Sequence, residues 1–232
     1  MSRDGDGPVV RSLSPSTQFL EYPSTFPVSR RPVIFWDARP RIMVDFRMSS
    51  SDERFWMARV DAIIGSRVEG LERCGLVQTG SYKRAQFILR NSRFRSRMLW
   101  NGDSDEKSGT IRAFKLRAGE GAVLVSPSMV AGVNFPDDEC RWILWPKLPY
   151  PDMRSPVMRR RQKEDRDQRS ALMVKQFVQG CGRGNRHEMD WCEAITVDGH
   201  ASHIRADLDR FAPGYFNEAW QVTTTMPPPL QP

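Results

Sequence analysis

The segment from Gln179 to Arg186 carries the residue types best suited to chemistry on an anion. It reads Gln-Gly-Cys-Gly-Arg-Gly-Asn-Arg and follows a stretch with helical spacing of apolar residues. Arg183 and Arg186 stand three residues apart, so one helical turn would aim both guanidinium groups at the same target. Arginine keeps its charge and its donor fork matches phosphate oxygens, which suits it to stabilising a transferring phosphoryl group. The plainer interpretation is a solvated basic turn, and the framing Gln179 and Gly182 count against it.

Length and charge limit the protein that could carry such a segment. The chain has 232 residues and a net charge of +7. This length is enough for one α/β domain with a proper core, alone or with irregular flanks. The basic surplus favours a polyanionic partner, and nucleic acid first. No apolar run approaches the roughly 18 residues that a membrane span needs, and the first residues lack an apolar signal region, so we expect a soluble cytoplasmic protein with no membrane partner.

The cysteine and histidine pattern argues against a metal centre. The four cysteines are scattered and form no Cys-x-x-Cys pair, which suits reduced cytosolic thiols better than a zinc site or cluster. The three histidines fit surface positions better than ligand positions. We therefore predict that the chain holds no metal; the residues concerned are Cys74, Cys140, Cys181, Cys192, His187, His200 and His203.

Short apolar segments alternate with segments of helical spacing along most of the chain. This alternation predicts an α/β fold with a parallel sheet covered by helices on both faces. Strands are expected at 76–79, 98–100, 122–125, 143–145 and 194–197. Helices are expected at about 52–69, with a capping box at Ser50 and Glu53, from Ser81 onward, at 106–116, and around 171–178.

The two ends of the chain differ in composition from the middle. Residues 1–50 are rich in Pro, Ser and Arg, with prolines too closely spaced for a long helix or a central strand, so we expect an extended leading segment. The domain is expected to occupy 51–220, followed by a Pro-rich tail at 221–232 without fixed structure.

Hydroxyl side chains follow two of the expected strands. Thr79 and Ser81 come after the first strand, and Ser126 and Ser128 come after the strand at 122–125. Ligands of open parallel sheets gather at the carboxyl ends of strands, so both loops are candidates for phosphate contacts. The alternatives are a helix cap for the first loop and an ordinary turn for the second.

A basic stretch, 154–169, contains seven arginines and lysines interleaved with Glu164, Asp165 and Asp167. Charge runs of this kind usually form the solvated face of a helix, and a nucleic-acid groove is the alternative.

Taken in order, these segments resemble the second motor domain of superfamily 2 DNA helicases of the DinG and XPD type, over roughly residues 20–220. Residues 78–82 resemble motif IV, residues 125–136 motif V, residues 145–151 the "K-L-P-F-P" segment that follows it, and residues 179–186 motif VI. Residues 23–27 resemble the start of the domain in that family. Three motifs in this order and spacing identify the family, where one alone would not.

The resemblance implies a RecA-like domain and a role for each motif. In such helicases ATP and Mg2+ lie between two domains, and the first domain supplies the phosphate loop and the metal-binding acids. Arg183 and Arg186 would approach the γ-phosphate, with Gln179 orienting that end of the nucleotide. The remaining residues implied to contact nucleotide are Gly132, Asn134 and Gly182; those implied to contact single-stranded DNA are Thr79, Ser81, Ser126 and Ser128.

The sequence departs from the family in two places. Asn134 stands where the family usually has Asp, which puts the coupling between motifs in doubt. No Gly-x-x-x-x-Gly-Lys-Ser/Thr motif and no Asp-Glu-x-His box occurs, so this chain resembles half of a motor. It is expected to need a helicase first domain, in cis or in trans. The alternative is a non-catalytic nucleic-acid-binding or partner-binding remnant that keeps the fold.

Overall fold

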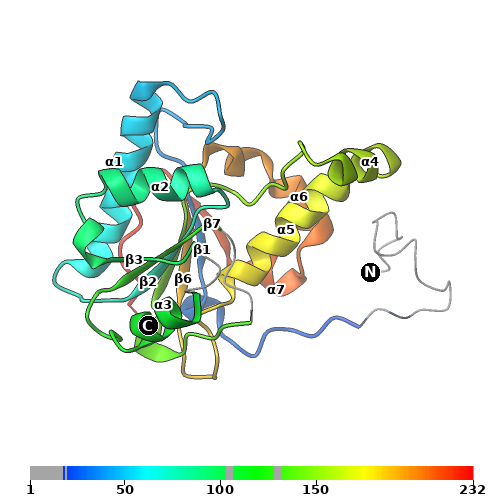
Figure 1. The fold of residues 1–232 in the computed structure, drawn as a ribbon. Helices are drawn as coiled ribbons and strands as arrows, with labels where there is room; N and C mark the ends of the chain where they lie inside the picture. The colour runs from blue at the N-terminus through cyan, green and yellow to red at the C-terminus, as the bar shows by residue number, and fades with distance from the viewer. Residues whose placement is uncertain (1–17, 19, 103–106, 128–131, 232) are drawn as a thin grey trace.

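A parallel sheet of seven strands lies at the centre of the computed structural model, which describes residues 18, 20–102, 107–127 and 132–231 (Figure 1). The strand order is β3-β4-β2-β5-β6-β1-β7, and every neighbouring pair runs parallel. The strands are β1 (Val33–Trp36), β2 (Gly75–Gln78), β3 (Met98–Trp100), β4 (Val123–Ser126), β5 (Trp142–Trp145), β6 (Glu193–Thr196) and β7 (Trp220–Thr223).

Helices cover both faces of this sheet, which confirms the predicted α/β class. One face carries α1 (Ser50–Val68) and α2 (Tyr82–Asn91); the other carries α3 (Lys107–Lys115), α5 (Gln168–Cys181), α6 (Arg205–Phe211) and α7 (Gly214–Ala219). Successive residues of β4 alternate between the two cores: Val123 and Val125 pack with α1 and α2, while Leu124 packs with α3 and α5. The remaining helix, α4 (Pro156–Glu164), precedes α5 and lies away from the sheet (Figure 1).

Helix α1 shows how local sequence sets an element. Its N-cap is Ser49, which forms a capping box with Asp52, one residue earlier than the pair expected from the sequence. The side chains predicted to face the core are all fully buried; they are Trp56, Val60, Ile63, Ile64 and Val68. The sequence periodicity therefore located both the helix and its buried face.

The leading segment contributes a strand that the proline spacing argued against. Strand β1 lies inside the sheet, between β6 and β7, so the expectation of no central strand in residues 1–50 is wrong. The physical reason is length: a strand of four residues, Val33–Trp36, fits between Pro32 and Pro40. The carbonyl of Pro32 accepts a hydrogen bond from the amide of Ala194 at 2.9 Å. The sheet also extends past residue 220 through β7.

The Pro-rich tail is held against the sheet rather than lacking fixed structure. Arg67 donates to the carbonyls of Pro227 and Pro228 at 3.0 and 3.2 Å, and Arg73 donates to the carbonyl of Leu230 at 2.8 Å. The amide of Leu230 donates to Glu193 at 3.2 Å. The prediction of an unstructured tail is therefore wrong, because main-chain carbonyls of the tail accept hydrogen bonds from Arg67 on α1 and from Arg73 before β2.

Arg67 and Glu193 form a buried ion pair that joins the end of α1 to the start of β6. Nε and Nη2 of Arg67 donate to the two carboxylate oxygens at 3.1 and 2.8 Å, and both side chains are at most 1% exposed. Within the described ranges, no helix is long and apolar enough to cross a membrane.

Removing one partner of this pair should destabilise the whole domain. Glu193→Gln leaves the Arg67 guanidinium buried without a counter-charge, and such losses cost about 3–5 kcal/mol of unfolding free energy. The matched control is Glu164→Gln, which breaks an exposed pair with Arg160 and should change the unfolding free energy by less than about 1 kcal/mol. Urea unfolding of both variants measures the difference; equal small shifts would contradict the expected role of the buried pair.

Candidate functional site

The arginines of the Gln179–Arg186 segment lie in a turn, not on a helix. Helix α5 ends at Cys181, and Gly182 is its C-cap, so the expectation that one helical turn presents both guanidinium groups is wrong. After the end of the helix, Gly184 packs closely against Cys192, where a Cβ at Gly184 would lie 2.5 Å from the Cys192 sulfur. Arg183 and Arg186 remain neighbours, because Nε of Arg186 donates to the Arg183 carbonyl at 3.2 Å.

Neither of these guanidinium groups pairs with a carboxylate among the described residues. Burial lowers the pKa of Arg183, and the charge of Arg186 lowers it further. Burial also lowers the pKa of Arg186, partly opposed by the charge of Asp190. Nε of Arg183 is buried and has no acceptor in the described part of the chain. Two close cations with an unsatisfied donor favour the binding of an anion between them.

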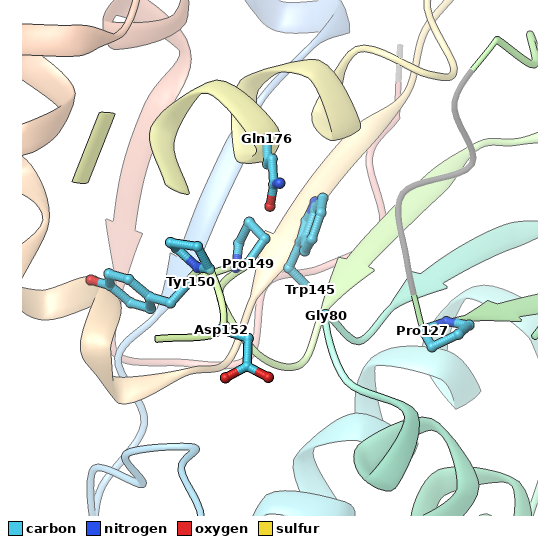
Figure 2. Close-up of a pocket in the computed structure, with 8 residues that line it drawn as sticks. Gly80, Pro127, Trp145, Pro149, Tyr150, Asp152 and Gln176 are labelled. Atoms are coloured by element: carbon cyan, nitrogen blue, oxygen red, sulfur yellow. The ribbon is translucent and has the colours of Figure 1, made fainter. Parts of the chain in front are cut away.

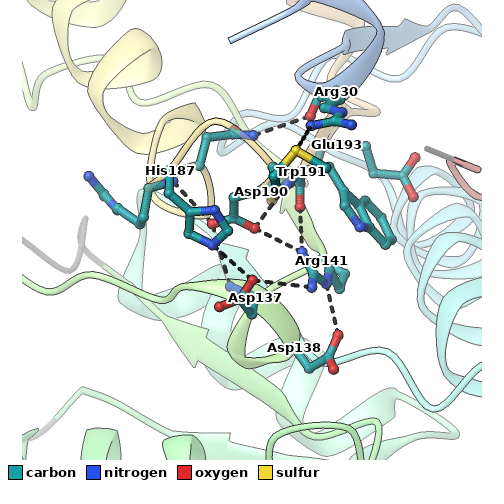
Figure 3. Close-up of polar contacts among 12 residues, drawn as sticks. Arg30, Asp137, Asp138, Arg141, His187, Asp190, Trp191 and Glu193 are labelled. Atoms are coloured by element: carbon teal, nitrogen blue, oxygen red, sulfur yellow. Dashed lines mark hydrogen bonds and ion pairs between the residues drawn. The ribbon is translucent and has the colours of Figure 1, made fainter. Parts of the chain in front are cut away.

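A buried carboxylate fixes the backbone of this turn (Figure 3). Asp190 is fully buried, and its Oδ1 accepts a hydrogen bond from Nη1 of Arg141 at 2.8 Å. Its Oδ2 accepts the main-chain amide of Arg186 at 3.0 Å. Arg141 also lies over the ring of Trp191, 4.6 Å from its centroid. The turn is thereby tied to the start of β5.

The segment identified as motif V reaches the same turn. The amide of Phe135 donates to the carbonyl of Arg183 at 3.4 Å. This bond places the end of the motif V segment beside residues 182–186, called the arginine turn. Asn134 is exposed, and its carbonyl accepts a hydrogen bond from Lys115 Nζ at 2.5 Å. The structure thus brings the motif V segment to the arginines, as the resemblance implies. The other residues implied to contact nucleotide, Gln179, Gly132 and Gly182, are exposed.

The residues implied to contact DNA lie together at the carboxyl ends of β2 and β4. Thr79 is fully buried, and its hydroxyl donates to the Ser81 carbonyl at 2.8 Å. The Thr79 amide donates to the carbonyl of Ser126, which is 2% exposed. Ser81 is the N-cap of α2, so the helix-cap alternative is confirmed. Ser128 lies outside the described residues, and contact of these residues with DNA stays a prediction.

A cavity of about 400 Å³ opens beside these two loops (Figure 2). Its wall combines prolines and aromatic rings with the polar ends of Asp152 and Gln176. Burial raises the pKa of Tyr150 to about 12, and the charge of Asp198 acts in the same direction. The cavity is lined by Gly80, Pro127, Trp145, Pro149, Tyr150, Pro151, Asp152 and Gln176.

The loops after β2 and β4 and the turn that carries Arg183 and Arg186 therefore occupy opposite edges of the sheet. The loops that carry Thr79, Ser81 and Ser126, called the hydroxyl loops, lie at the carboxyl ends of β2 and β4, as expected for an open parallel sheet. The arginine turn precedes β6, because α5 returns from the carboxyl edge to the amino edge. The sequence argument placed polar function only at the carboxyl ends, and the second location follows from the direction of α5.

One cluster of possible metal ligands occurs among the described residues. Asp137, His187 and Asp190 each offer one atom, and these atoms lie within 4.8 Å of one another. Arg141 already pairs with both carboxylates, at 3.7 Å from Asp137 and 2.8 Å from Asp190. The cluster is therefore an ion-pair network, in which His187 is bonded to Asp137 at 3.0 Å, and the expectation of no metal stays a prediction.

Sequence reasoning did not single out Asp190, Arg141 or Gly184. A signal was present for the first two, since Arg141 and Asp190 each stand a few residues before an expected strand. In a parallel sheet such positions share one edge. No sequence signal distinguishes Gly184 from Gly182, because the close approach to Cys192 depends on the fold.

Two substitutions in the same turn should have opposite effects on stability. At Gly184 a new Cβ would also lie 2.8 Å from the Cys140 carbonyl, so Gly184→Ala should cost about 1–3 kcal/mol of unfolding free energy. At Gly182 the nearest atom would be 3.8 Å away, so Gly182→Ala should be neutral or stabilise by up to about 1 kcal/mol. Urea unfolding tests both, and a destabilisation that is larger for Gly182→Ala would refute the geometry.

Comparisons with known proteins agree with this arrangement. The family model for the helicase C-terminal domain matches residues 75–208. No curated protein matches the chain significantly. Among solved structures, S. tokodaii Xpd4 is similar with a TM-score of 0.52 and 14% identity, over 83% of this chain and 38% of that one. An apo XPD structure has a TM-score of 0.54 and 14% identity, over 83% of this chain and 40% of that one.

A further solved structure shares the fold. S. cerevisiae Dbp5 L327V, solved bound to RNA and ADP BeF3, is similar with a TM-score of 0.52 and 12% identity, over 90% of this chain and 46% of that one. The chain thus spans about two fifths of the XPD structures that it matches. The RecA-like fold and the resemblance seen in the motifs are confirmed. The chain belongs to the helicase C-terminal domain family.

Proposed function

We propose that this chain is the second motor domain of an ATP-dependent DNA helicase, which couples ATP hydrolysis to translocation on single-stranded DNA. The observation that carries the proposal is the pair of neighbouring guanidinium groups, Arg183 and Arg186, without a carboxylate partner among the described residues. The activity requires a first domain, in cis or in trans, that carries a phosphate loop and acids for Mg2+. Four free thiols support a reducing compartment such as the cytoplasm.

The residues of the arginine turn fit the γ-phosphate end of ATP. Nε of Arg183 is a buried donor that a phosphate oxygen would satisfy, and Arg186 adds a second positive charge at its side. When bound, ATP with Mg2+ supplies the phosphoryl group that is transferred to water. Arg183 and Arg186 hold its oxygens and stabilise the charge that develops there, while Asp190 keeps the amide of Arg186 in place.

The opposite edge of the sheet would carry the DNA strand. The loops after β2 and β4 are fastened to each other by the Thr79 amide and the Ser126 carbonyl, at 3.0 Å. Because the hydroxyls of Thr79 and Ser126 are buried, they shape the loops, and main-chain groups of the loops and Ser81 are left to meet phosphates. Closure of the two domains on ATP would then move the arginine edge and the strand-binding edge as one body.

A non-catalytic binding module remains the alternative function. Asn134 supports it, because an exposed amide replaces the family's usual carboxylate beside the arginine turn. The two proposals differ in one measurable property, which is ATP turnover in the presence of a first domain.

Reconstitution with a first motor domain tests the proposal. The chain alone should show no DNA-stimulated ATPase activity, and the mixture should turn over ATP. In the mixture, Arg183→Ala or Arg186→Ala should lower the rate by about 10³- to 10⁵-fold while DNA binding changes little, because these groups act on charge in the transition state. Lysine at either position should rescue poorly, since it lacks the planar fork.

The matched control is Arg160→Ala, on the exposed helix α4, which should change turnover little. Equal losses for Arg183→Ala and Arg160→Ala would refute the special role of the arginine turn. Absence of turnover with any first domain would favour the non-catalytic module.

A further inference from the structure

Helix α4 has no buried side chain. It comprises nine residues, Pro156–Glu164, and Figure 1 shows it at the end of α5 that is remote from the sheet. A helix this short is marginal in water unless an apolar face packs against the body of the protein. Helix α4 buries no such face, so its exposed surface is not explained by the packing of the domain.

The exposed surface of α4 and the following turn is rich in unpaired positive charge. Four exposed cations form no ion pair with any described residue; they are Arg159, Arg161, Lys163 and Arg166. By contrast, Arg160 pairs with Glu164 at 2.9 Å, and Arg154 pairs with Asp152 at 2.8 Å. The solvated-face interpretation accounts for the paired arginines but leaves the four unpaired cations without a role.

Side-chain contacts help to hold the segment from α4 to the start of α5 in position. The side-chain amide of Gln162 donates to the carbonyl of Arg166 at 2.6 Å, which joins α4 to the turn after it. Asp167 at the start of α5 pairs with Arg210 of α6 at 2.6 Å. The unpaired cations therefore stand on an anchored arm.

This arm is continuous with the edge of the sheet that carries the hydroxyl loops. The guanidinium of Arg169 lies over the ring of Tyr150, 4.7 Å from its centroid. Tyr150 lines the cavity of Figure 2, together with Gly80 and Pro127 of the two loops. A chain of contacts thus leads from the loops, through the cavity, to the arm.

We propose that α4 and the turn after it form a phosphate-binding arm, which extends the path of a single nucleic-acid strand beyond the loops after β2 and β4. The inference rests on the proposed function, since that function places the strand at this edge. The cations act on phosphates and read no bases, so binding is insensitive to sequence and falls steeply with salt. The net charge of +7 favours the same partner over an acidic protein segment, because it attracts a polyanion to the whole molecule.

The test is the salt dependence of binding to oligothymidylate DNA and to an unrelated mixed-sequence strand, measured by fluorescence anisotropy with the full chain. The arm variant carries Arg159→Gln, Arg161→Gln and Lys163→Gln. Each lost contact with a single strand reduces the slope of log K against log salt by about 0.7, so the arm variant should flatten the slope by about 2. Both strands should respond alike.

The matched control removes the same charge elsewhere, from arginines that already have partners. It carries Arg39→Gln, Arg117→Gln and Arg205→Gln, whose side chains are at least partly exposed and pair with Asp37, Glu120 and Asp209. Its slope should stay close to that of the wild type. Thermal melting should give wild-type midpoints for both variants, because every changed side chain is at least partly exposed.

Three results would overturn the proposal of a phosphate-binding arm. They are a wild-type salt slope in the arm variant, an equally flattened salt slope in both variants, or no binding of single strands by the wild type. The first two leave the proposed function intact. That function is judged by reconstituted ATPase activity and its loss in Arg183→Ala, neither of which depends on the arm.

Discussion

The ion pair between Asp190 and Arg141 is the contact on which the arginine turn depends. Asp190 accepts both the Arg141 guanidinium, at 2.8 Å, and the main-chain amide of Arg186, at 3.0 Å. A fully buried carboxylate is costly unless it is paired and hydrogen-bonded, so this arrangement strongly disfavours any turn conformation that releases it. The result is a turn whose backbone is held by a buried carboxylate, while the guanidinium groups of Arg183 and Arg186 have no carboxylate partner among the described residues.

The direction of α5 decides where each group of candidate residues lies. The helix begins near the carboxyl end of β5 and ends at the amino end of β6, so it carries the arginine turn to the edge opposite the hydroxyl loops. The sheet between them has two cores, and the residues of β4 alternate between them. Because such packing resists deformation, a displacement of one edge is transmitted to the other as a rigid-body movement.

Local patterns in the sequence predicted most of the elements but not the contacts between distant segments. Apolar runs located β2 to β6, and periodicity located α1 and its buried side chains. Strand β1 was missed because it has only four residues and lies between two prolines, and its stability comes from pairing with β6 and β7. The tail was missed for the same kind of reason, since its carbonyls bind Arg67, far away in the sequence. In the candidate site the arginines were predicted from their types, whereas the contribution of Asp190 depends on two strands meeting at one edge.

Arginines that count equally in the net charge differ in whether a carboxylate pairs with them. Arg160 and Arg161 are adjacent on α4 and both are exposed, yet only Arg160 has a carboxylate partner among the described residues. An exposed ion pair adds little stability, but it neutralises a charge that a phosphate would otherwise attract. An unpaired guanidinium keeps that attraction and is repelled by nearby cations. Burial is the main cause that lowers the pKa of Arg183, and the charge of Arg186 lowers it further. Selection for stability alone gives no reason to keep such groups close together, whereas binding of a polyanion does.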